Sequence, residues 1–179
     1  GFAVSASGQT LVATSVVDDG QTGSAYTFPA GGGTGGAQTQ TAKLTPSDPE
    51  ANANFGAAVA TDGQRILVGA WADNAFAGSV YRYDAVGAIA RNELNRVPGE
   101  VGGLLGLSVD VEGATEAYGA PGTAIDGRDD QGAVSIVFDP APVGDTTPPG
   151  LVLKTRKGKL GKPVKIKASC DEPCKVGAT

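Results

Sequence analysis

The side chains that could do chemistry in this sequence are mostly carboxylates, gathered in three short segments. These segments are Asp18-Asp19-Gly20, Asp73-Asn74 and Asp126-Gly127-Arg128-Asp129-Asp130. Carboxylates in a loop can supply oxygens to a hard divalent cation, which takes about six to eight of them. They can equally form Asx turns, in which an Asp accepts backbone N–H groups and needs no metal. The third segment carries the most acids (Asp126, Asp129 and Asp130), so it is the strongest candidate for a cation site.

The sequence contains no histidine. This removes the most common general base, the Ser-His and Cys-His nucleophile pairs, and the most common zinc ligand. No other set of titratable residues forms a catalytic pattern, so we expect no catalytic residue and no enzyme activity in this chain.

Two further pairs of residues are candidates for a chemical role. Cys170 and Cys174 are separated by Asp-Glu-Pro, which can turn the chain back on itself, and in a secreted protein we favour a disulfide there. A zinc site would need further ligands, and a redox site usually has Cys-x-x-Cys spacing. Trp71 and Phe76 bracket the second acidic segment. Such rings either stack on a sugar or peptide ligand or pack between sheets.

The elements that must position these residues are short strands. The chain has 28 glycines and 11 prolines scattered between runs of Val, Ile, Ala and Tyr, which predicts many tight turns and an all-β fold. In one segment we expect strands over residues 57–60, 66–68 and 79–83, with a tight turn at Asp62-Gly63 and a less regular stretch over 88–94.

An internal repeat organises these strands. Residues 1–28 align with residues 56–83 at a constant offset of 55, which pairs Gly23 with Gly78 and Tyr26 with Tyr81. A third copy begins at Leu105-Gly106 and continues through Gly119-Ala120-Pro121 to Gly132-Ala133-Val134. Four strands in about 50 residues is the size of one propeller blade. A generic antiparallel sandwich is the alternative.

The repeats resemble the FG-GAP family. The resemblance rests on four elements in the family's usual order: Ala42-Lys43-Leu44-Thr45-Pro46-Ser47-Asp48, Phe55-Gly56-Ala57-Ala58-Val59-Ala60, Leu67-Val68-Gly69-Ala70 and Gly78-Ser79-Val80-Tyr81. The third copy has Leu105-Gly106 where Phe-Gly is usual, and the first has Ala13-Thr14-Ser15 where Gly-Ala-Pro is usual.

The resemblance implies blades of a β-propeller, like those of integrin α-subunit heads and of many bacterial secreted proteins. Phe55 and Leu105 would then be core residues between blades. The resemblance also implies calcium at the acidic loops, with Asp126, Asp129 and Asp130 as the first choice. Asp18, Asp19, Asp73 and Asn74 are the weaker choices.

Charge divides the chain at Asp145-Thr146-Thr147-Pro148-Pro149. Residues 1–145 carry 17 acids and 6 bases, whereas residues 146–179 carry 2 acids and 8 bases. We therefore expect propeller blades over 1–141 (repeats 1–54, 55–104 and 105–141), a Pro-rich linker over 142–150, and the start of a basic immunoglobulin-like β-domain over 151–179. The expected fold class is a partial propeller of about three four-stranded blades plus a truncated sandwich-like segment.

These expectations favour a non-catalytic binding or adhesion module of a secreted or cell-surface protein, whose propeller loops contact a protein or glycan. The alternative is an accessory or structural region of a larger secreted enzyme. An acidic blade region argues against nucleic acid, and no apolar run is long enough for membrane insertion. Because a propeller typically needs four to eight blades, about three should be completed by further blades in a longer protein or by self-association.

Overall fold

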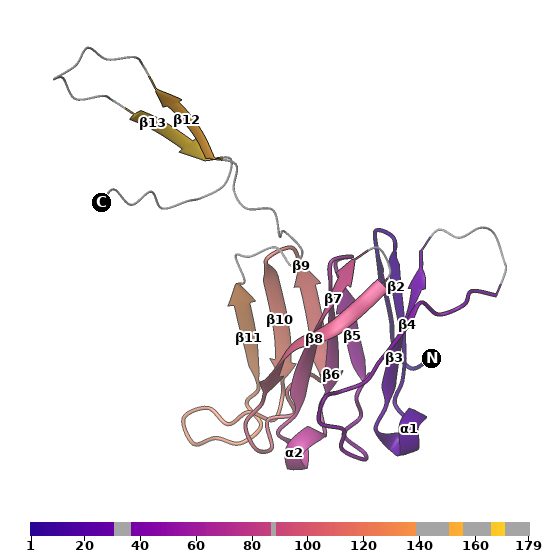
Figure 1. Cartoon of the computed structure of the whole chain (residues 1–179). Helices are drawn as coiled ribbons and strands as arrows, with labels where there is room; N and C mark the ends of the chain where they lie inside the picture. The colour runs from indigo at the N-terminus through magenta and orange to yellow at the C-terminus, as the bar shows by residue number, and fades with distance from the viewer. Residues whose placement is uncertain (31–36, 87–88, 139–150, 156–165, 171–179) are drawn as a thin grey trace. The chain divides into compact units, whose positions relative to one another are not determined.

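The computed structural model describes residues 1–30, 37–86, 89–138, 151–155 and 166–170, and their side chains except at 86, 89–96, 151–155 and 166–170 (Figure 1). The chain divides into two compact units, Gly1–Gly144 and Asp145–Thr179. In the second unit, β12 (Leu151–Thr155) and β13 (Ile166–Cys170) form an antiparallel pair.

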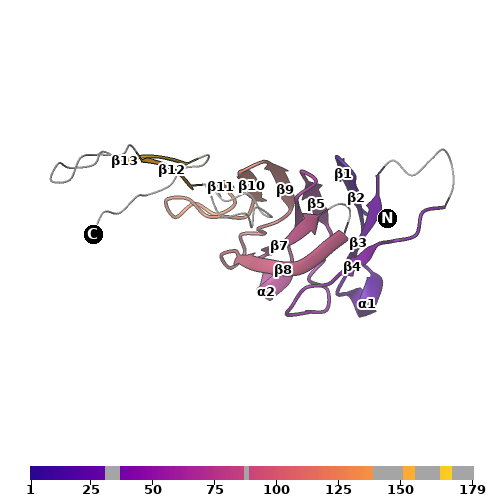
Figure 2. The ribbon, with the colours of Figure 1, turned by 45° about the horizontal axis from the view of Figure 1, so that its top comes forward.

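Three antiparallel sheets make up the first unit, each built from consecutive strands. The first contains β1 (Val4–Ser7), β2 (Thr10–Ser15), β3 (Ser24–Pro29) and β4 (Ala42–Leu44). The second contains β5 (Ala58–Thr61), β6 (Arg65–Ala70), β7 (Ser79–Val86) and β8 (Ile89–Pro98). The third contains β9 (Ser108–Glu112), β10 (Thr115–Ala120) and β11 (Ala133–Phe138) within the described residues. Figures 1 and 2 show the three sheets side by side in chain order.

The second sheet is covered on both faces, which explains why every residue of β6 is buried. Side chains alternate across a strand. Ile66 and Val68 therefore pack in one cluster with residues of the first sheet, and Leu67 packs in a second cluster with residues of the third sheet. A continuous apolar run is typical of a strand buried on both faces.

The predicted strands and the Asp62-Gly63 turn are present. From residue 89 on, the less regular stretch expected over 88–94 lies in the ten-residue strand β8, whose pairing with β7 shifts register between Arg82 and Tyr83 and between Tyr83 and Ala85. Such bulges interrupt the regular alternation of side chains, which is the signal that identifies a strand in a sequence. At the turn, Gly63 has a φ of 92°, a conformation that favours glycine.

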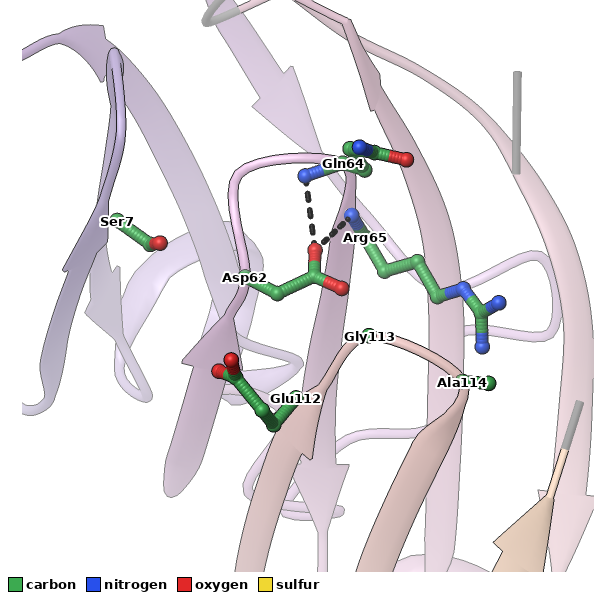
Figure 3. A pocket seen from close by; sticks show the side chains of 7 residues that line it. All are labelled: Ser7, Asp62, Gln64, Arg65, Glu112, Gly113 and Ala114. Atoms are coloured by element: carbon green, nitrogen blue, oxygen red, sulfur yellow. Dashed lines mark hydrogen bonds between the residues drawn. The ribbon is translucent and has the colours of Figure 1, made fainter. Parts of the chain in front are cut away.

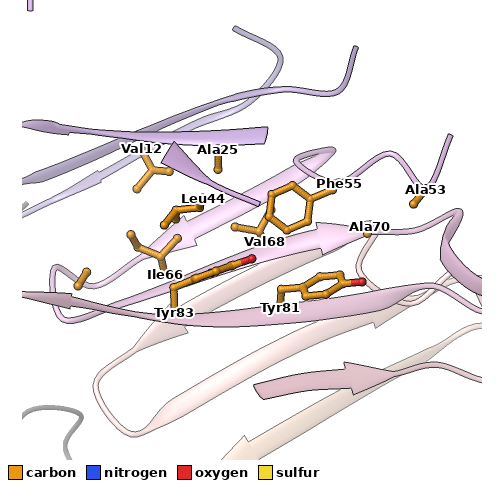
Figure 4. Close-up of a cluster of buried hydrophobic side chains, with 11 residues drawn as sticks. Val12, Ala25, Leu44, Ala53, Phe55, Ile66, Val68, Ala70, Tyr81 and Tyr83 are labelled. Carbon is orange, nitrogen blue, oxygen red and sulfur yellow. The ribbon is translucent and has the colours of Figure 1, made fainter. Parts of the chain in front are cut away.

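Phe55 lies at the centre of the contact between the first two sheets (Figure 4). Its side chain is fully buried, and its ring meets Tyr81 at 5.3 Å and Tyr83 at 6.3 Å in edge-to-face arrangements. Leu105 is 4% exposed and packs between the second and third sheets. The expectation that these two residues form the core between repeats is therefore confirmed.

Glycine allows the backbone of one repeat to lie directly against the next. Gly78 has a φ of 78°, and a Cβ added there would lie 2.2 Å from the carbonyl oxygen of Leu105. Gly23 occupies the same place in the first repeat, where an added Cβ would lie 2.1 Å from the carbonyl oxygen of Phe55. No side chain fits at either position, so the repeats stack at backbone contact.

The all-β class is thus confirmed in the described residues. A closed or partial propeller stays a prediction, as does an immunoglobulin-like module after residue 150. The predicted domain limits also stay predictions.

We expect Phe55→Ala to lower the free energy of unfolding by about 3–5 kcal/mol, because it empties a buried aromatic site between two sheets. Chemical denaturation followed by circular dichroism measures the change. Phe2→Ala is the matched control, since Phe2 is 64% exposed and should cost less than about 0.5 kcal/mol. Equal losses in the two variants would contradict the packing described above.

Candidate functional site

The three acidic segments lie at one end of the three sheets, opposite the β1–β2, β5–β6 and β9–β10 hairpin turns (Figure 1). We call this the loop end: α1 (Asp18–Gln21), α2 (Asp73–Phe76) and the loop over 121–132. The repeat places them together, because each segment follows the second strand of its sheet. The structure therefore brings the predicted site residues to a common end.

The α2 segment is a tight turn anchored by a buried carboxylate. Asn74, Ala75 and Phe76 have φ values of 48°, 54° and 67°, which is left-handed backbone that costs on the order of 1 kcal/mol per residue. Asp73 is 2% exposed, and its Oδ2 accepts hydrogen bonds from Ser79 Oγ at 2.5 Å and from Tyr81 Oη at 3.3 Å. These bonds satisfy the carboxylate inside the fold, which is a structural role.

Neighbouring acids extend this polar cluster. Asp48 Oδ1 accepts a hydrogen bond from Tyr81 Oη at 2.7 Å, and Glu50 Oε2 accepts one from the Asn74 N–H at 3.0 Å. Tyr81 thus joins the carboxylates of Asp48 and Asp73 through its hydroxyl group. Sequence reasoning missed Asp48 and Glu50, because only the fold brings their segment to α2.

The α1 segment is the equivalent turn of the first repeat, but its two carboxylates pair with the side chain of Lys43. Lys43 Nζ lies 2.7 Å from Asp19 Oδ1 and 3.3 Å from Asp18 Oδ2. Tyr26 donates a hydrogen bond to Asp18 Oδ2, and Ser24 donates one to Asp19 Oδ2 at 2.7 Å. The ammonium group of Lys43 therefore contacts both carboxylates.

These contacts shift the ionisation of the cluster. The Tyr26 hydroxyl, then the Asp19 backbone N–H and Lys43, lower the pKa of Asp18 from 3.8 to about 2. Lys43 and then Ser24 lower the pKa of Asp19, and the bond to Asp18 raises the pKa of Tyr26. The hydrogen bond to Asp19 is the main reason that the pKa of Lys43 is raised. The cluster therefore favours its charged form.

The third acidic segment lies in an exposed loop. Ile125 and Arg128 exchange two backbone hydrogen bonds of 3.0 Å each, which form a tight turn around Asp126 and Gly127. Asp126, Asp129 and Asp130 are all exposed.

In the part of the chain that the structure describes, no three His, Cys, Asp or Glu side chains are grouped so as to hold a metal ion. In α1 and α2 the carboxylate oxygens are bound by hydroxyl, ammonium or backbone groups of the chain. Calcium stays a prediction, both at Asp126, Asp129 and Asp130 and, as the weaker choice, at Asp18, Asp19, Asp73 and Asn74.

Trp71 and Phe76 form a pair at the loop end. Their ring centroids lie 6.0 Å apart at an interplanar angle of 34°, and Phe76 is 54% exposed while Trp71 is half-buried. A large, exposed aromatic ring on a turn held by buried bonds is a surface that can stack on a ligand.

A cavity of about 350 Å³ opens at the other end of the sheets, beside the β1–β2, β5–β6 and β9–β10 hairpin turns (Figure 3). Ser7, Asp62, Gln64, Arg65, Glu112, Gly113 and Ala114 line it. Asp62 Oδ1 accepts the backbone N–H groups of Gln64 at 2.8 Å and Arg65 at 2.7 Å, as in an Asx turn. The Arg65 guanidinium is directed into the protein instead, toward Glu116.

Glu116 is a buried charge that sequence reasoning missed. It is fully buried, and its Oε1 accepts hydrogen bonds from Arg65 at 2.8 Å and from Arg82 at 2.7 Å. Tyr118 donates a hydrogen bond to its Oε2, and burial and then this bond raise the pKa of Tyr118. Arg65 and Arg82 belong to the second sheet, so the network joins two sheets. The alternation of side chains along β10 could have identified it, because Glu116 lies on the same buried face as Tyr118 and Ala120.

The predicted disulfide between Cys170 and Cys174 lies outside the residues whose side chains the structure describes. The backbone of Cys170 ends β13, and Cys174 lies outside the described residues.

Repeated antiparallel sheets of this kind define an all-β repeat protein. Within it, residues 38–83 match the family model of the FG-GAP repeat, which supports the FG-GAP family. The match spans the last strand of the first sheet, Phe55 and most of the second sheet through Tyr83. A comparison with curated proteins found none that matches this chain. Among the described residues, no helix has the length and apolar character needed to cross a membrane.

We expect Asp18 to stabilise the fold fully above pH 3.8 and to lose this effect as the pH falls to about 2, because its pKa is lowered on folding. Asp18→Asn should therefore have a lower denaturation midpoint than the unsubstituted chain at pH 6, and the difference should close between pH 3.8 and about 2. In Tyr26→Phe, which lacks the largest cause of the shift, it should close nearer pH 3.8. A difference that stays constant down to pH 2 would contradict this assignment.

Proposed function

We propose that this chain is a non-catalytic binding module of an extracellular or cell-surface protein, and that its loop end contacts a protein or glycan. FG-GAP repeats commonly occur in extracellular proteins of the adhesion type, and residues 38–83 match that repeat. The observation that carries the proposal is the Trp71–Phe76 ring pair at α2, in which Phe76 is exposed.

Rigidity of the loop end supports this role. A ring that is already fixed loses little conformational entropy when it binds. The backbone that carries Phe76 is held because α2 is closed by hydrogen bonds from the Gly78 N–H to the Asp73 carbonyl at 2.9 Å and from the Ala77 N–H to the Asn74 carbonyl at 3.2 Å. The buried Asp73 side chain then holds the turn against β7.

Polar groups near the rings supply the other part of a recognition surface. Glu50 and Asn74 lie at the same turn and are exposed. A face with an aromatic platform and flanking hydrogen-bonding groups is suited to sugar rings and to extended peptides, which present both apolar and polar edges. In a propeller arrangement of the repeats, the three loops of the loop end would form one continuous contact face.

Trp71 is the only tryptophan, so its fluorescence reports directly on this surface. We expect a panel of soluble polysaccharides and extracellular-matrix proteins to contain a ligand that shifts this fluorescence on titration. Phe76→Ala should weaken that binding at least about fivefold, since interface aromatics commonly contribute more than ~1 kcal/mol.

Phe2→Ala is the control for this experiment, because it removes an exposed phenylalanine from a different part of the first unit. It should leave the dissociation constant unchanged. If Phe76→Ala and Phe2→Ala bind alike, or if no probe in the panel shifts the fluorescence, the proposed surface is wrong.

Calcium is a separate part of the proposal and concerns the third loop. If Asp126, Asp129 and Asp130 bind calcium, exchanging chelator for millimolar calcium should raise the thermal midpoint by several degrees, since a ligand at a hundred times its dissociation constant stabilises by about 2.7 kcal/mol. Replacing the three aspartates by Asn should abolish the rise. Asp18→Asn with Asp19→Asn should preserve it, because those two carboxylates already pair with Lys43. If the thermal midpoint does not change in calcium, the calcium proposal is wrong and these acids serve only to form turns.

A further inference from the structure

The second and third sheets meet differently at their two ends. At the loop end their backbones touch, since the Leu105 N–H donates to the Ala77 carbonyl at 3.0 Å and Leu105 also forms a parallel bridge with Gly78. At the other end, which we call the hairpin end, the cavity of about 350 Å³ lies between the hairpin turns, with Gln64 and Glu112 among the residues that line it (Figure 3). The contact is therefore tight at the loop end and looser at the hairpin end.

Arg65 lies at the start of β6, beside this cavity, and brings a positive charge into the contact. It is 2% exposed, and its Nη1 donates a hydrogen bond to Glu116 Oε1 of the third sheet at 2.8 Å. The same oxygen accepts a hydrogen bond from Arg82 Nη2 at 2.7 Å. Two guanidinium groups thus share one carboxylate, and Glu116 supplies one negative charge against their two positive charges.

Asp84 brings a second negative charge to this face of the second sheet. Val80 packs toward the third sheet and Arg82 meets Glu116, so the alternation along β7 places Asp84 on the same face. Among the described side chains, Asp84 Oδ1 is the one buried nitrogen or oxygen atom without a hydrogen-bond partner. A buried carboxylate oxygen without a partner is costly, so its position calls for an explanation.

The register of the second sheet places Asp84 within reach of Arg65. The two residues lie directly opposite each other on β6 and β7. Residues in this relation have Cβ atoms about 5 Å apart, which a long arginine side chain easily spans. Arg65 therefore has two carboxylates within reach: Glu116 of the next sheet, which it contacts, and Asp84 of its own sheet. A guanidinium group that exchanges one for the other does not leave its charge buried without a partner.

Glu116 keeps other partners when Arg65 leaves it. Arg82 contacts its Oε1 through Nε at 3.1 Å as well as through Nη2, and Tyr118 donates to its Oε2. Arg82 lies opposite Leu67, two residues farther from the hairpin turn than Arg65. The bonds of Arg82 and Tyr118 thus hold the two sheets together deeper in the contact, whereas the bond of Arg65 joins them next to the turns.

We propose that the second and third sheets form a hinge that opens at the hairpin end, and that Arg65 exchanges its bond to Glu116 for one to Asp84 as the hinge opens. The backbone contact between Gly78 and Leu105 at the loop end is the pivot, and opening widens the cavity between the turns. This inference goes beyond the proposed ligand binding, since it concerns the opposite end of the sheets from Trp71 and Phe76.

The test measures ¹⁵N relaxation dispersion of the whole chain, which detects exchange with a minor state on the microsecond-to-millisecond timescale of hinge motions. We expect dispersion at the amides of Gly63 and Gly113, which lie in the hairpin turns on either side of the hinge. The amides of Gly78 and Gly106, at the loop end, should show none, because the pivot does not move.

Asp84→Asn should lower the population of the minor state at least about fivefold, because a hydrogen bond from a guanidinium group to a neutral amide is weaker than one to a carboxylate. Asp110→Asn is the matched control and should leave the population unchanged. Asp110 is exposed, and the alternation along β9 places it on the face opposite to Val109 and Val111, which pack toward the second sheet.

A second variant tests the exchange of partners itself. Glu116→Gln should raise the population of the open state and move the Arg65 Nε–Hε signal toward the position that dispersion assigns to the minor state. Adding Asp84→Asn should reverse that movement, which a role of Asp84 in stability alone would not do.

The Asp84→Asn measurement does not depend on this second variant, so it decides the matter if Glu116→Gln does not fold. Flat dispersion at Gly63 and Gly113 in the unsubstituted chain, or an equal minor population in Asp84→Asn and Asp110→Asn, would overturn the hinge. Dispersion of equal size at both ends of the sheets would also overturn it, because the third sheet would then detach as a whole.

Discussion

The stacking of the repeats depends on backbone contact at a glycine in the loop end. At Gly78 and Gly23 the carbonyl oxygen of the next repeat occupies the space of a side chain, so any other residue would push the sheets apart. This contact fixes the distance between sheets, and that distance sets the volume available to Phe55 and Leu105. The cores between repeats can be closely packed only because the backbones first meet at these glycines.

Equivalent positions of the repeat form the two contacts between the sheets and the outer face of the third sheet, but the side chains at these positions differ in chemical type. An aromatic cluster around Phe55 joins the first and second sheets, and an ionic network around Glu116 joins the second and third sheets. The far face of the third sheet is apolar at Ile136, where the second sheet has Arg82. Such differences let similar sheets stack in one order, because a mismatched pair would bury a charge without its partner.

The loop end follows from the same stacking. In the first two sheets, the turn after the second strand lies close to the glycine contact, so the backbone of the neighbouring repeat limits its shape. A carboxylate completes each of these turns: the buried Asp73 with Ser79 and Tyr81, and the exposed Asp19 with Ser24 and Lys43. Asp73 and Asp19 thus stabilise these turns, while the Phe76 ring next to Trp71 is exposed at the surface.

Local and periodic signals in the sequence were enough to identify three strands of the second sheet and the turn at Gly63, and the resemblance to the repeat family pointed to Phe55 and Leu105 as core residues. These features repeat at a fixed offset, and the physical rules behind them act within a few residues. Partners that meet only after the sheets have stacked could not be found in this way. Glu116 and Arg65 are 51 residues apart, and Lys43 reaches Asp19 only because β4 pairs with β3. Only the tertiary pairing decided that the first acidic segment contacts this lysine, because charge interactions depend on distance in space and not along the chain.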